Sequence, residues 1–174
     1  MATLHISHTW NGESVAAAER CFVEVTGTET AWLVEVNAPF HGDPPPPAPS
    51  GSLDGLWSFE VVELFVAAAG PDNGGVDYTE VELSPPGHYL ILRFAGVRRR
   101  VARLEPLSAH CRITGDRWHG RIELPRGALP PPPWRANAFA MHGLGEARRH
   151  LAATPLPGGR PDFHQPRVFR RFFL

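Results

Sequence analysis

Short runs of alternating apolar and polar residues make up most of the chain, and clusters of Gly, Pro, Asn and Asp separate them. Strict alternation over a few residues is typical of β-strands that bury one face. The helical spacing, with an apolar residue every three or four positions, is scarce. The pattern therefore predicts an all-β protein, and about eight or nine such runs favour an antiparallel two-sheet β-sandwich of jelly-roll type.

The first half of the chain carries a predicted hairpin and a long loop. Three runs alternate there, at residues 4–10, 21–27 and 31–38. Only a short Thr/Gly/Glu turn separates the last two, so we expect them to pair as a hairpin. Residues 41–53 include Pro44–Pro47, which lack the N–H groups that a strand ladder needs. We expect an exposed proline-rich loop here, inside a single domain that spans residues 1–174.

The second half holds the strongest strand patterns, at residues 56–70, 76–84, 88–96, 117–125 and 134–143. A turn at 71–75 separates the first two runs, and the Pro-Pro-Gly turn at 85–87 joins the next two as antiparallel neighbours. Residues 148–174 are rich in proline and end in the letters FRRFFL. We name this segment the C-terminal strap and expect it to pack irregularly across the sandwich.

Three acidic side chains are predicted to share one sheet face. Successive side chains on a strand point to opposite faces. Glu63 therefore faces away from its apolar neighbours, and Glu80 and Glu82 do the same on the following strand. Clustered carboxylates raise one another's pKa unless a cation lies close by. We expect Arg93 or Arg121 to supply that cation.

Aromatic residues are expected on the same face as the acids. Trp57, Phe65 and Tyr78 have the required positions, and exposed rings beside hydrogen-bonding groups are typical of sites for sugars or planar ligands. The simpler interpretation is a solvated sheet face on which opposite charges pair across strands. Alternation alone leaves both interpretations open.

Two later segments carry further candidate residues. A glycine-rich turn brings together His142, Glu146 and Arg148, as one wall of a cleft could. Asp162 and His164 stand two residues apart, so an extended chain places both on one side, where the acid could orient the imidazole. The simpler alternative is a turn-capping Asp beside a packing His. We predict that both segments converge on the cleft of the three carboxylates.

Four segments of the chain carry a resemblance to other proteins, and they read DGLWSFEVVELFV, DYTEVELSPPGHYLIL, NAFAMHGLGEARRHLAATPLP and PDFH. In these segments the chain resembles an uncharacterised, DOMON-like family of small bacterial and animal proteins. The family is in turn distantly similar to the family 9 carbohydrate-binding modules. The resemblance implies an antiparallel β-sandwich and does not by itself imply an activity.

The more distant likeness rests mainly on the spacing W-x5-E-x-F, here Trp57, Glu63 and Phe65. In family 9 modules the Trp stacks on the sugar and the Glu hydrogen-bonds its hydroxyl groups, and an Asn of a late strand also contributes. The resemblance carries that last role to Asn137. The second stacking Trp of those modules has no counterpart, because Ala140 stands in its place.

Composition and missing motifs narrow the classes of function. The 17 basic residues, all Arg, against 18 acidic ones give a net charge of −1, so binding to nucleic acid through bulk charge is not expected. The chain shows no export signal and no apolar run of about 18 residues, so we expect a cytoplasmic protein that does not bind membranes. In that compartment Cys21 and Cys111 should stay unpaired. The sequence does not indicate the oligomeric state.

We expect neither a cofactor nor a metal. The sequence has no CxxCH, HExxH or GxSxG motif and no phosphate-binding glycine loop. Met141 and His142 are adjacent on a predicted strand and so point to opposite faces, which prevents both from ligating one haem iron.

The leading hypothesis is a non-catalytic module that binds a carbohydrate or another small polar molecule. Its candidate ligand-binding residues are Trp57, Glu63, Tyr78, Glu80, Glu82, Asn137, His142, Arg148, Asp162 and His164. The alternative is an enzyme of unknown reaction, with Glu63 or Glu80 and His142 or His164 as proton carriers. A protein-interaction domain that uses Pro44–Pro47 is a third possibility. One sandwich fold hosts many functions, so the fold does not decide among them.

Overall fold

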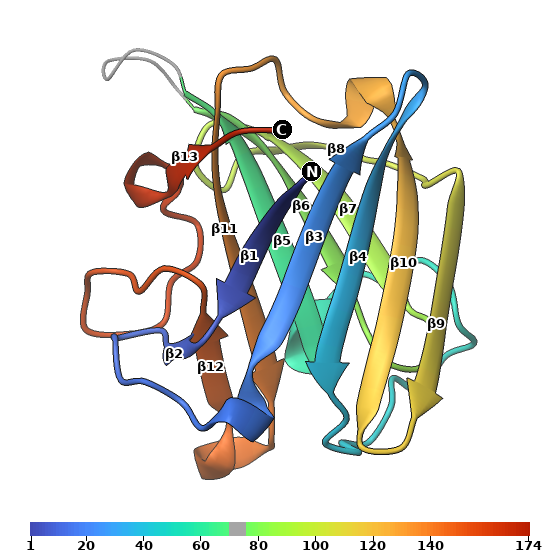
Figure 1. Ribbon diagram of the computed structural model, residues 1–174, viewed down its shortest axis with the longest axis vertical. Coiled ribbons are helices and arrows are strands. Elements are labelled where there is room, and N and C mark those ends of the chain that lie inside the picture. Colours follow the sequence, from blue (N-terminus) through green and yellow to red (C-terminus); the bar gives the residue numbers. More distant parts are fainter. Residues whose placement is uncertain (70–75) are drawn as a thin grey trace.

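The computed structural model describes residues 1–69 and 76–174, and these form two antiparallel sheets that pack face to face (Figure 1). The sheet nearer the viewer is five-stranded, with the order β1 (Ala2–Ile6), β3 (Cys21–Gly27), β4 (Ala31–Pro39), β10 (Arg117–Pro125) and β9 (Ser108–Thr114). The predicted all-β two-sheet sandwich is confirmed. No α-helix occurs within these two ranges.

The second sheet is eight-stranded and lies behind the first in Figure 1. Its order is β2 (His8–Thr9), β12 (Arg149–Ala152), β11 (Trp134–His142), β5 (Val61–Ala68), β6 (Asp77–Leu83), β7 (Tyr89–Ala95) and β8 (Arg100–Arg103), and β13 (Arg170–Phe172) pairs with β11 as well. The site described below lies on the outer face of this sheet, around β5 and β6.

The predicted hairpins are present. β3 and β4 pair in antiparallel register, with Val25 opposite Val34. β6 and β7 pair around the Pro-Pro-Gly turn, where the N–H of Ser84 donates to the carbonyl of His88 over 3.0 Å. Gly87 in this turn has φ 88°, a backbone conformation that favours glycine. The expected turn at 71–75 lies outside the described residues.

Several predicted boundaries were wrong. Residues 56–58, expected to begin a strand, form a short 3-10 turn, η2 (Leu56–Ser58). The run at residues 4–10 divides into β1 and β2, which belong to different sheets. Four further strands were not predicted, namely β8, β9, β12 and β13. β8 and β9 have largely exposed or half-buried positions, so their sequences lack the apolar alternation that reveals a half-buried strand.

The apolar core lies between the two sheets. Val62, Leu64 and Val66 of β5 point into it, together with Trp118 and Ile122 of β10. Alternation along each strand explains this choice, because it leaves every second residue for the opposite face. Burial of these aliphatic and aromatic side chains supplies the main driving force for packing the sheets together.

A second apolar layer covers the outer face of the eight-stranded sheet. Phe65 and Phe139 belong to it, and the C-terminal strap adds Phe163 and Phe169. The rings of Phe139 and Phe163 stack in parallel, with centroids 3.9 Å apart. The strap therefore packs on the sandwich through its aromatic residues. Its ends, β12 and β13, are regular strands.

The proline-rich loop is held at its start by buried polar contacts. The backbone N–H groups of His41 and Asp43 donate to the Glu60 carboxylate over 2.9 and 3.2 Å. The Asp43 carboxylate accepts a hydrogen bond of 2.6 Å from the N–H of Gly143. Three of the four prolines in Pro44–Pro47 are exposed.

Across the part of the chain that the structure describes, no helix has the length and apolar character needed to cross a membrane.

We predict that Cys21 and Cys111 do not form a disulfide. The order β3-β4-β10-β9 puts two strands between them, roughly 14 Å at the usual strand spacing, whereas a disulfide needs Cα atoms within about 7 Å. Both thiols are free, and burial raises their pKa to about 12 and about 11. Alkylation without reductant, read by mass spectrometry, should modify both thiols in denatured protein and only slowly in folded protein. A mass that retains a bridge after denaturation would contradict the prediction.

We predict that Asn137→Ala lowers the free energy of unfolding by about 2–3 kcal/mol. The fully buried Asn137 amide donates to the carbonyl of Thr154 over 2.8 Å and accepts from the Thr154 N–H over 2.9 Å. Alanine would leave both backbone groups without these partners. Urea denaturation measures the loss, and Asn11→Ala at an exposed position is the control, with an expected change below about 0.5 kcal/mol. Equal effects in the two variants would show that this contact is not stabilising.

Candidate functional site

Three glutamates lie side by side on the outer face of the eight-stranded sheet. The register of β5 and β6 places Glu63 opposite Glu82 and Phe65 opposite Glu80. Residues directly opposite one another share a face, so the three carboxylates point the same way. One oxygen from each lies within 4.8 Å of the other two. The predicted clustering of these acids is confirmed.

The glutamate cluster is buried, although it lies on the outer face of a sheet. Glu63, Glu80 and Glu82 are only 2%, 3% and 0% exposed. The second apolar layer, including Leu56 of η2 and Phe163 of the strap, packs over this face. A solvated face with charges paired across strands is therefore not what the structure contains.

Burial weakens the acids of the cluster. Desolvation raises the pKa of Glu80 to about 8, although nearby arginines lower it. It also raises the pKa of Glu63 well above the ordinary value, with the Glu80 charge adding to the effect. The pKa of Glu82 rises for the same reasons, burial first and then the charges of the other two. An ionised carboxylate is costly in such surroundings, so a bound proton or cation is favoured.

The expected cations are not those that the structure provides. Leu92 of β7 stands opposite Glu80, which turns Arg93 to the other face, where it donates to the carbonyl of Gly127. Arg121 belongs to the five-stranded sheet and lies 3.6 Å from Glu35. The prediction of Arg93 or Arg121 beside the acids was therefore wrong.

Three other arginines approach the cluster. The charges of Arg98 and Arg100 act on Glu80, and that of Arg148 acts on Glu63. Each is engaged elsewhere by hydrogen bonds. Arg98 donates to Asp162 over 2.7 Å and Arg100 donates to Asp54 over 3.0 and 3.1 Å, whereas Arg148 donates to the backbone carbonyls of Trp57, Phe59 and Gly143.

A pocket of about 460 Å³ opens above the cluster. Glu63 and Glu80 contribute to its lining, and Trp57, which is 46% exposed, contributes from η2. The other lining residues are Phe65, Leu92, Phe94, Arg98, Arg100, Met141, His150, Pro161, Asp162, Phe163 and His164. The pocket thus combines aromatic walls with buried carboxyl groups.

The strap supplies one wall of this pocket. Its His164 shares a 2.7 Å hydrogen bond between Nδ1 and the Tyr78 hydroxyl, which also accepts from the N–H of Arg98. Burial lowers the pKa of His164 to about 4, so the ring is neutral at pH 7. Asp162 accepts from the His164 backbone N–H, not from the imidazole. The Asp–His pair therefore reaches the pocket without forming a carboxylate–imidazole bond.

The structure brings together some of the sequence-derived candidates. Trp57, Glu63, Glu80, Asp162 and His164 line the pocket. Glu82 completes the cluster, and Tyr78 supports His164.

The remaining candidates lie outside the pocket lining. Asn137 is on the same sheet face but is occupied by its bonds to Thr154 and Ala138. Arg148 holds the η2 turn that carries Trp57.

His142 does not reach this pocket, contrary to the predicted convergence. It shares the face of Ala138 and Ala140, and this face forms part of the core between the sheets. Its ring stacks on His41 with centroids 3.5 Å apart, and its Nε2 is 3.9 Å from Glu19. Strand alternation along β11 correctly predicted that His142 shares a face with Ala138 and Ala140. It could not show which face of the sheet carries the site.

Sequence reasoning missed Arg98, Arg100, Met141, His150 and Phe163 as pocket residues. Met141 directly precedes His142 on β11, so its side chain lies on the opposite face of the sheet from that of His142. Arg98 adopts φ 59°, which is uncommon for a residue other than glycine. No local pattern reveals the long-range approach of Arg98 to Asp162.

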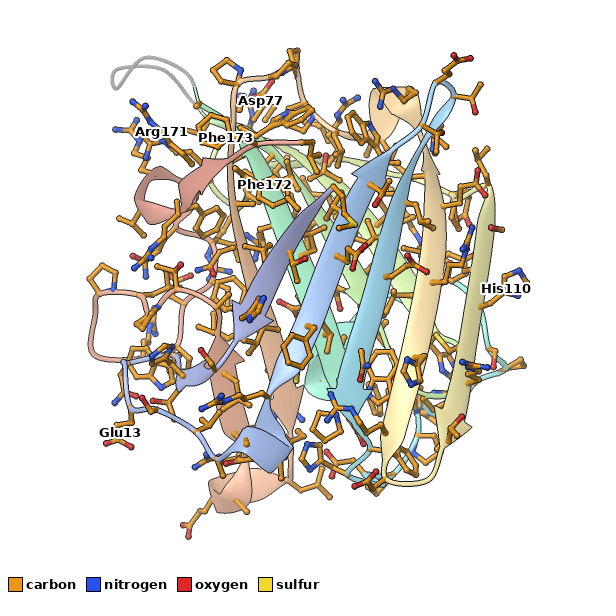
Figure 2. The ribbon with its side chains drawn as sticks, in the orientation of Figure 1. Glu13, Asp77, His110, Arg171, Phe172 and Phe173 are labelled. Carbon is orange, nitrogen blue, oxygen red and sulfur yellow. The ribbon has the colours of Figure 1, made fainter. Side chains whose placement is uncertain are left out.

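A larger hollow, of about 630 Å³, lies on the outer face of the five-stranded sheet. Its polar residues include Glu35 and Arg121, which form a half-exposed ion pair, and His110, which projects from β9 (Figure 2). Exposed ion pairs of this kind contribute little and are common on protein surfaces. The smaller pocket is the stronger candidate because its carboxyl groups are buried.

Comparison with solved structures shows proteins of similar fold. A "putative carbohydrate-binding protein" from Bacteroides uniformis superposes with a TM-score of 0.73 at 16% identity, covering 98% of this chain and 84% of that one. A family 9 carbohydrate-binding module from Caldicellulosiruptor kristjanssonii, in complex with glucose, gives a TM-score of 0.50 at 8% identity over 84% and 72% of the two chains. At these identities the likeness concerns the fold.

No protein-family model matches the chain. Curated animal proteins are nevertheless similar over nearly all of its length. The UPF0462 protein C4orf33 homolog of Mus musculus is 36% identical over 96% of this chain and 88% of its own length. The human protein is 35% identical over 96% and 85%, and that of Danio rerio 34% over 98% and 88%. The chain therefore belongs to the UPF0462 (C4orf33) family.

Proposed function

We propose that the protein binds a small polyhydroxylated ligand of the carbohydrate class in the pocket above Glu63 and Glu80. The observation that carries this proposal is a buried carboxyl cluster at a pocket whose rim holds an exposed tryptophan, Trp57. Specific small-molecule sites typically combine a concave, largely apolar lining with a few convergent polar groups.

The chemistry of the lining suits a sugar. A sugar presents hydroxyl groups that both donate and accept hydrogen bonds, and apolar C–H faces that pack on aromatic rings. Protonated carboxyl groups offer one donor and further acceptors, and the neutral imidazole of His164 offers one nitrogen that donates and one that accepts. Trp57 is placed to cover an apolar sugar face. Arg98 and Arg100 add charged donors at the border of the pocket.

The comparisons support the ligand class without identifying the sugar. Of the two solved structures compared above, one is described as a "putative carbohydrate-binding protein" and the other is a carbohydrate-binding module in complex with glucose. The spacing of Trp57, Glu63 and Phe65 also matches the pattern by which the chain resembles family 9 modules. We further infer that the family belongs with the DOMON-like sandwiches and includes bacterial as well as animal proteins.

Acid–base catalysis is a second candidate function. The observation that favours it is the pKa of Glu80, raised to about 8 within the pocket, because a general acid works best with a pKa near the ambient pH. His164 would be the second proton carrier. NMR spectra of each ligand incubated with the protein would show new resonances if this function holds, and unchanged spectra if the protein only binds.

We predict that a sugar at ten times its Kd raises the melting temperature by about 3–6 °C. A thermal-shift screen of mono- and disaccharides, with nucleotides and acidic metabolites for contrast, measures this change. Trp57→Ala should abolish the rise and leave the unliganded melting temperature within a few degrees, because Trp57 is half exposed.

Phe22→Ala is the matched control for this screen. Phe22 is a partly exposed ring on the opposite sheet, so its loss should leave the sugar response intact. A Trp57→Ala variant that responds as fully as the parent protein would remove the tryptophan from the proposed site.

We predict that stability falls as the pH rises from about 5 to 9 in protein treated with a chelator to remove bound cations. The folded-state pKa of Glu80, about 8, exceeds the unfolded value of about 4.3. Its stabilising contribution is therefore complete below about pH 4.3, decreases progressively above that pH, and is lost once the pH has risen through 8. Each retained proton changes the unfolding free energy by up to about 1.4 kcal/mol per pH unit.

Urea denaturation at several pH values tests this linkage. Glu80→Gln should show a shallower decline with pH than the parent protein, because glutamine does not titrate. Glu35→Gln, at a half-exposed position on the other sheet, should leave the decline unchanged. An equal decline in all three proteins would contradict the assignment to Glu80.

A further inference from the structure

We propose that Glu63, Glu80 and Glu82 form a binding site for a hard divalent cation, Ca²⁺ or Mn²⁺, beside the pocket. This site would coordinate a cation rather than hydrogen-bond a sugar, and it can exist whether or not the protein binds a sugar. Its role in holding a sugar, argued below, rests on the proposed function.

The geometry of the cluster meets the first requirement of a metal site. One carboxylate oxygen from each glutamate lies within 4.8 Å of the other two, and this limit is about twice the Ca²⁺–oxygen distance of roughly 2.4 Å. The three residues stand on β5 and β6, in the interior of the eight-stranded sheet, so paired backbones fix their positions. An all-carboxylate donor set suits hard cations such as Ca²⁺ and Mn²⁺, whereas zinc and copper prefer imidazole or thiolate.

A second and independent observation is the lack of partners for these oxygens. Oε1 of Glu63 and both carboxylate oxygens of Glu82 are buried, and none accepts a hydrogen bond from any residue that the structure describes. Buried polar atoms in folded proteins are nearly always paired. Each such oxygen therefore requires a proton, a water molecule or a cation.

The protein's own cations do not meet this requirement. Arg98 and Arg100 form their ion pairs with Asp162 and Asp54, at 2.7 and 3.0 Å. Arg148 donates to three backbone carbonyls. Among the described residues no ion pair reaches the cluster, which leaves up to three negative charges for a bound ion to neutralise.

Three carboxylates do not complete the coordination of such an ion. Ca²⁺ takes six to eight oxygen ligands, and Glu63 and Glu80 also line the pocket. The remaining positions can therefore be filled from the pocket, by water or by two neighbouring hydroxyl groups of a sugar. The inference thus names a ligand class for the proposed function, a vicinal diol held on a protein-bound cation.

Titration of chelator-treated protein with CaCl₂, MnCl₂ or MgCl₂ tests the site directly. We expect calorimetric binding of Ca²⁺ or Mn²⁺ and a rise of several degrees in the melting temperature at millimolar cation. Glu82→Gln should weaken the affinity at least tenfold. Because glutamine removes a buried ionisable group, the metal-free melting temperature of this variant should equal or exceed that of the parent protein.

Glu24→Gln is the control, since Glu24 lies on the five-stranded sheet near the other hollow, and this variant should bind the cation as the parent does. Absence of cation binding in the parent protein, or equal binding by Glu82→Gln, would overturn the cation site.

Sugar titrations with chelator and with Ca²⁺ separate the two proposals. Tighter sugar binding with Ca²⁺ supports both. Equal sugar binding in chelator overturns the role of the cation and supports the sugar site. Cation binding without any sugar binding supports the cation site and overturns the proposed function.

Discussion

The pairing of β5 with β6 is the constraint on which both the core and the candidate site depend. Val62 and Leu83 face each other across this pair on the side of the core, and Glu63 and Glu82 face each other on the opposite side. A slip of one residue would exchange the two faces and drive the acids between the sheets. Burial of apolar side chains on one side thus enforces contact between the acids on the other.

The part of the site that the sequence could predict is the part set by strand alternation. The period of two along a strand was enough to predict that Glu63, Glu80 and Glu82 share one face. The short turn between β6 and β7 was enough to predict that these strands pair. The cations near the three glutamates could not be predicted in this way, because they depend on contacts between distant segments. The face on which Arg93 lies is set by the register of β7 against β6, and alternation alone does not give that register.

The burial of the three glutamates also could not be predicted from a local sequence pattern. It arises because the C-terminal strap, which is distant in sequence from β5 and β6, packs aromatic rings such as Phe163 and Phe169 over the outer face. An alternating strand with acids on one side is normally solvated on that side. The strap converts such a surface into a pocket lined by buried carboxyl groups, and only tertiary packing determines where the strap lies.

The same strap has a consequence for folding kinetics. Tyr78 and His164, joined by a hydrogen bond, are 86 residues apart in sequence, and contacts of such high sequence separation close large loops and form slowly. The pocket is therefore complete only when nearly the whole chain has found its topology. Locally, the segment between β12 and β13 has few backbone ladder bonds to hold it, so its detachment by sub-global opening would expose the acids at a lower free energy than global unfolding. Opening of this segment, rather than of β5 or β6, would then set the rate at which deeply bound molecules enter and leave, and amide hydrogen exchange in the segment would report that opening.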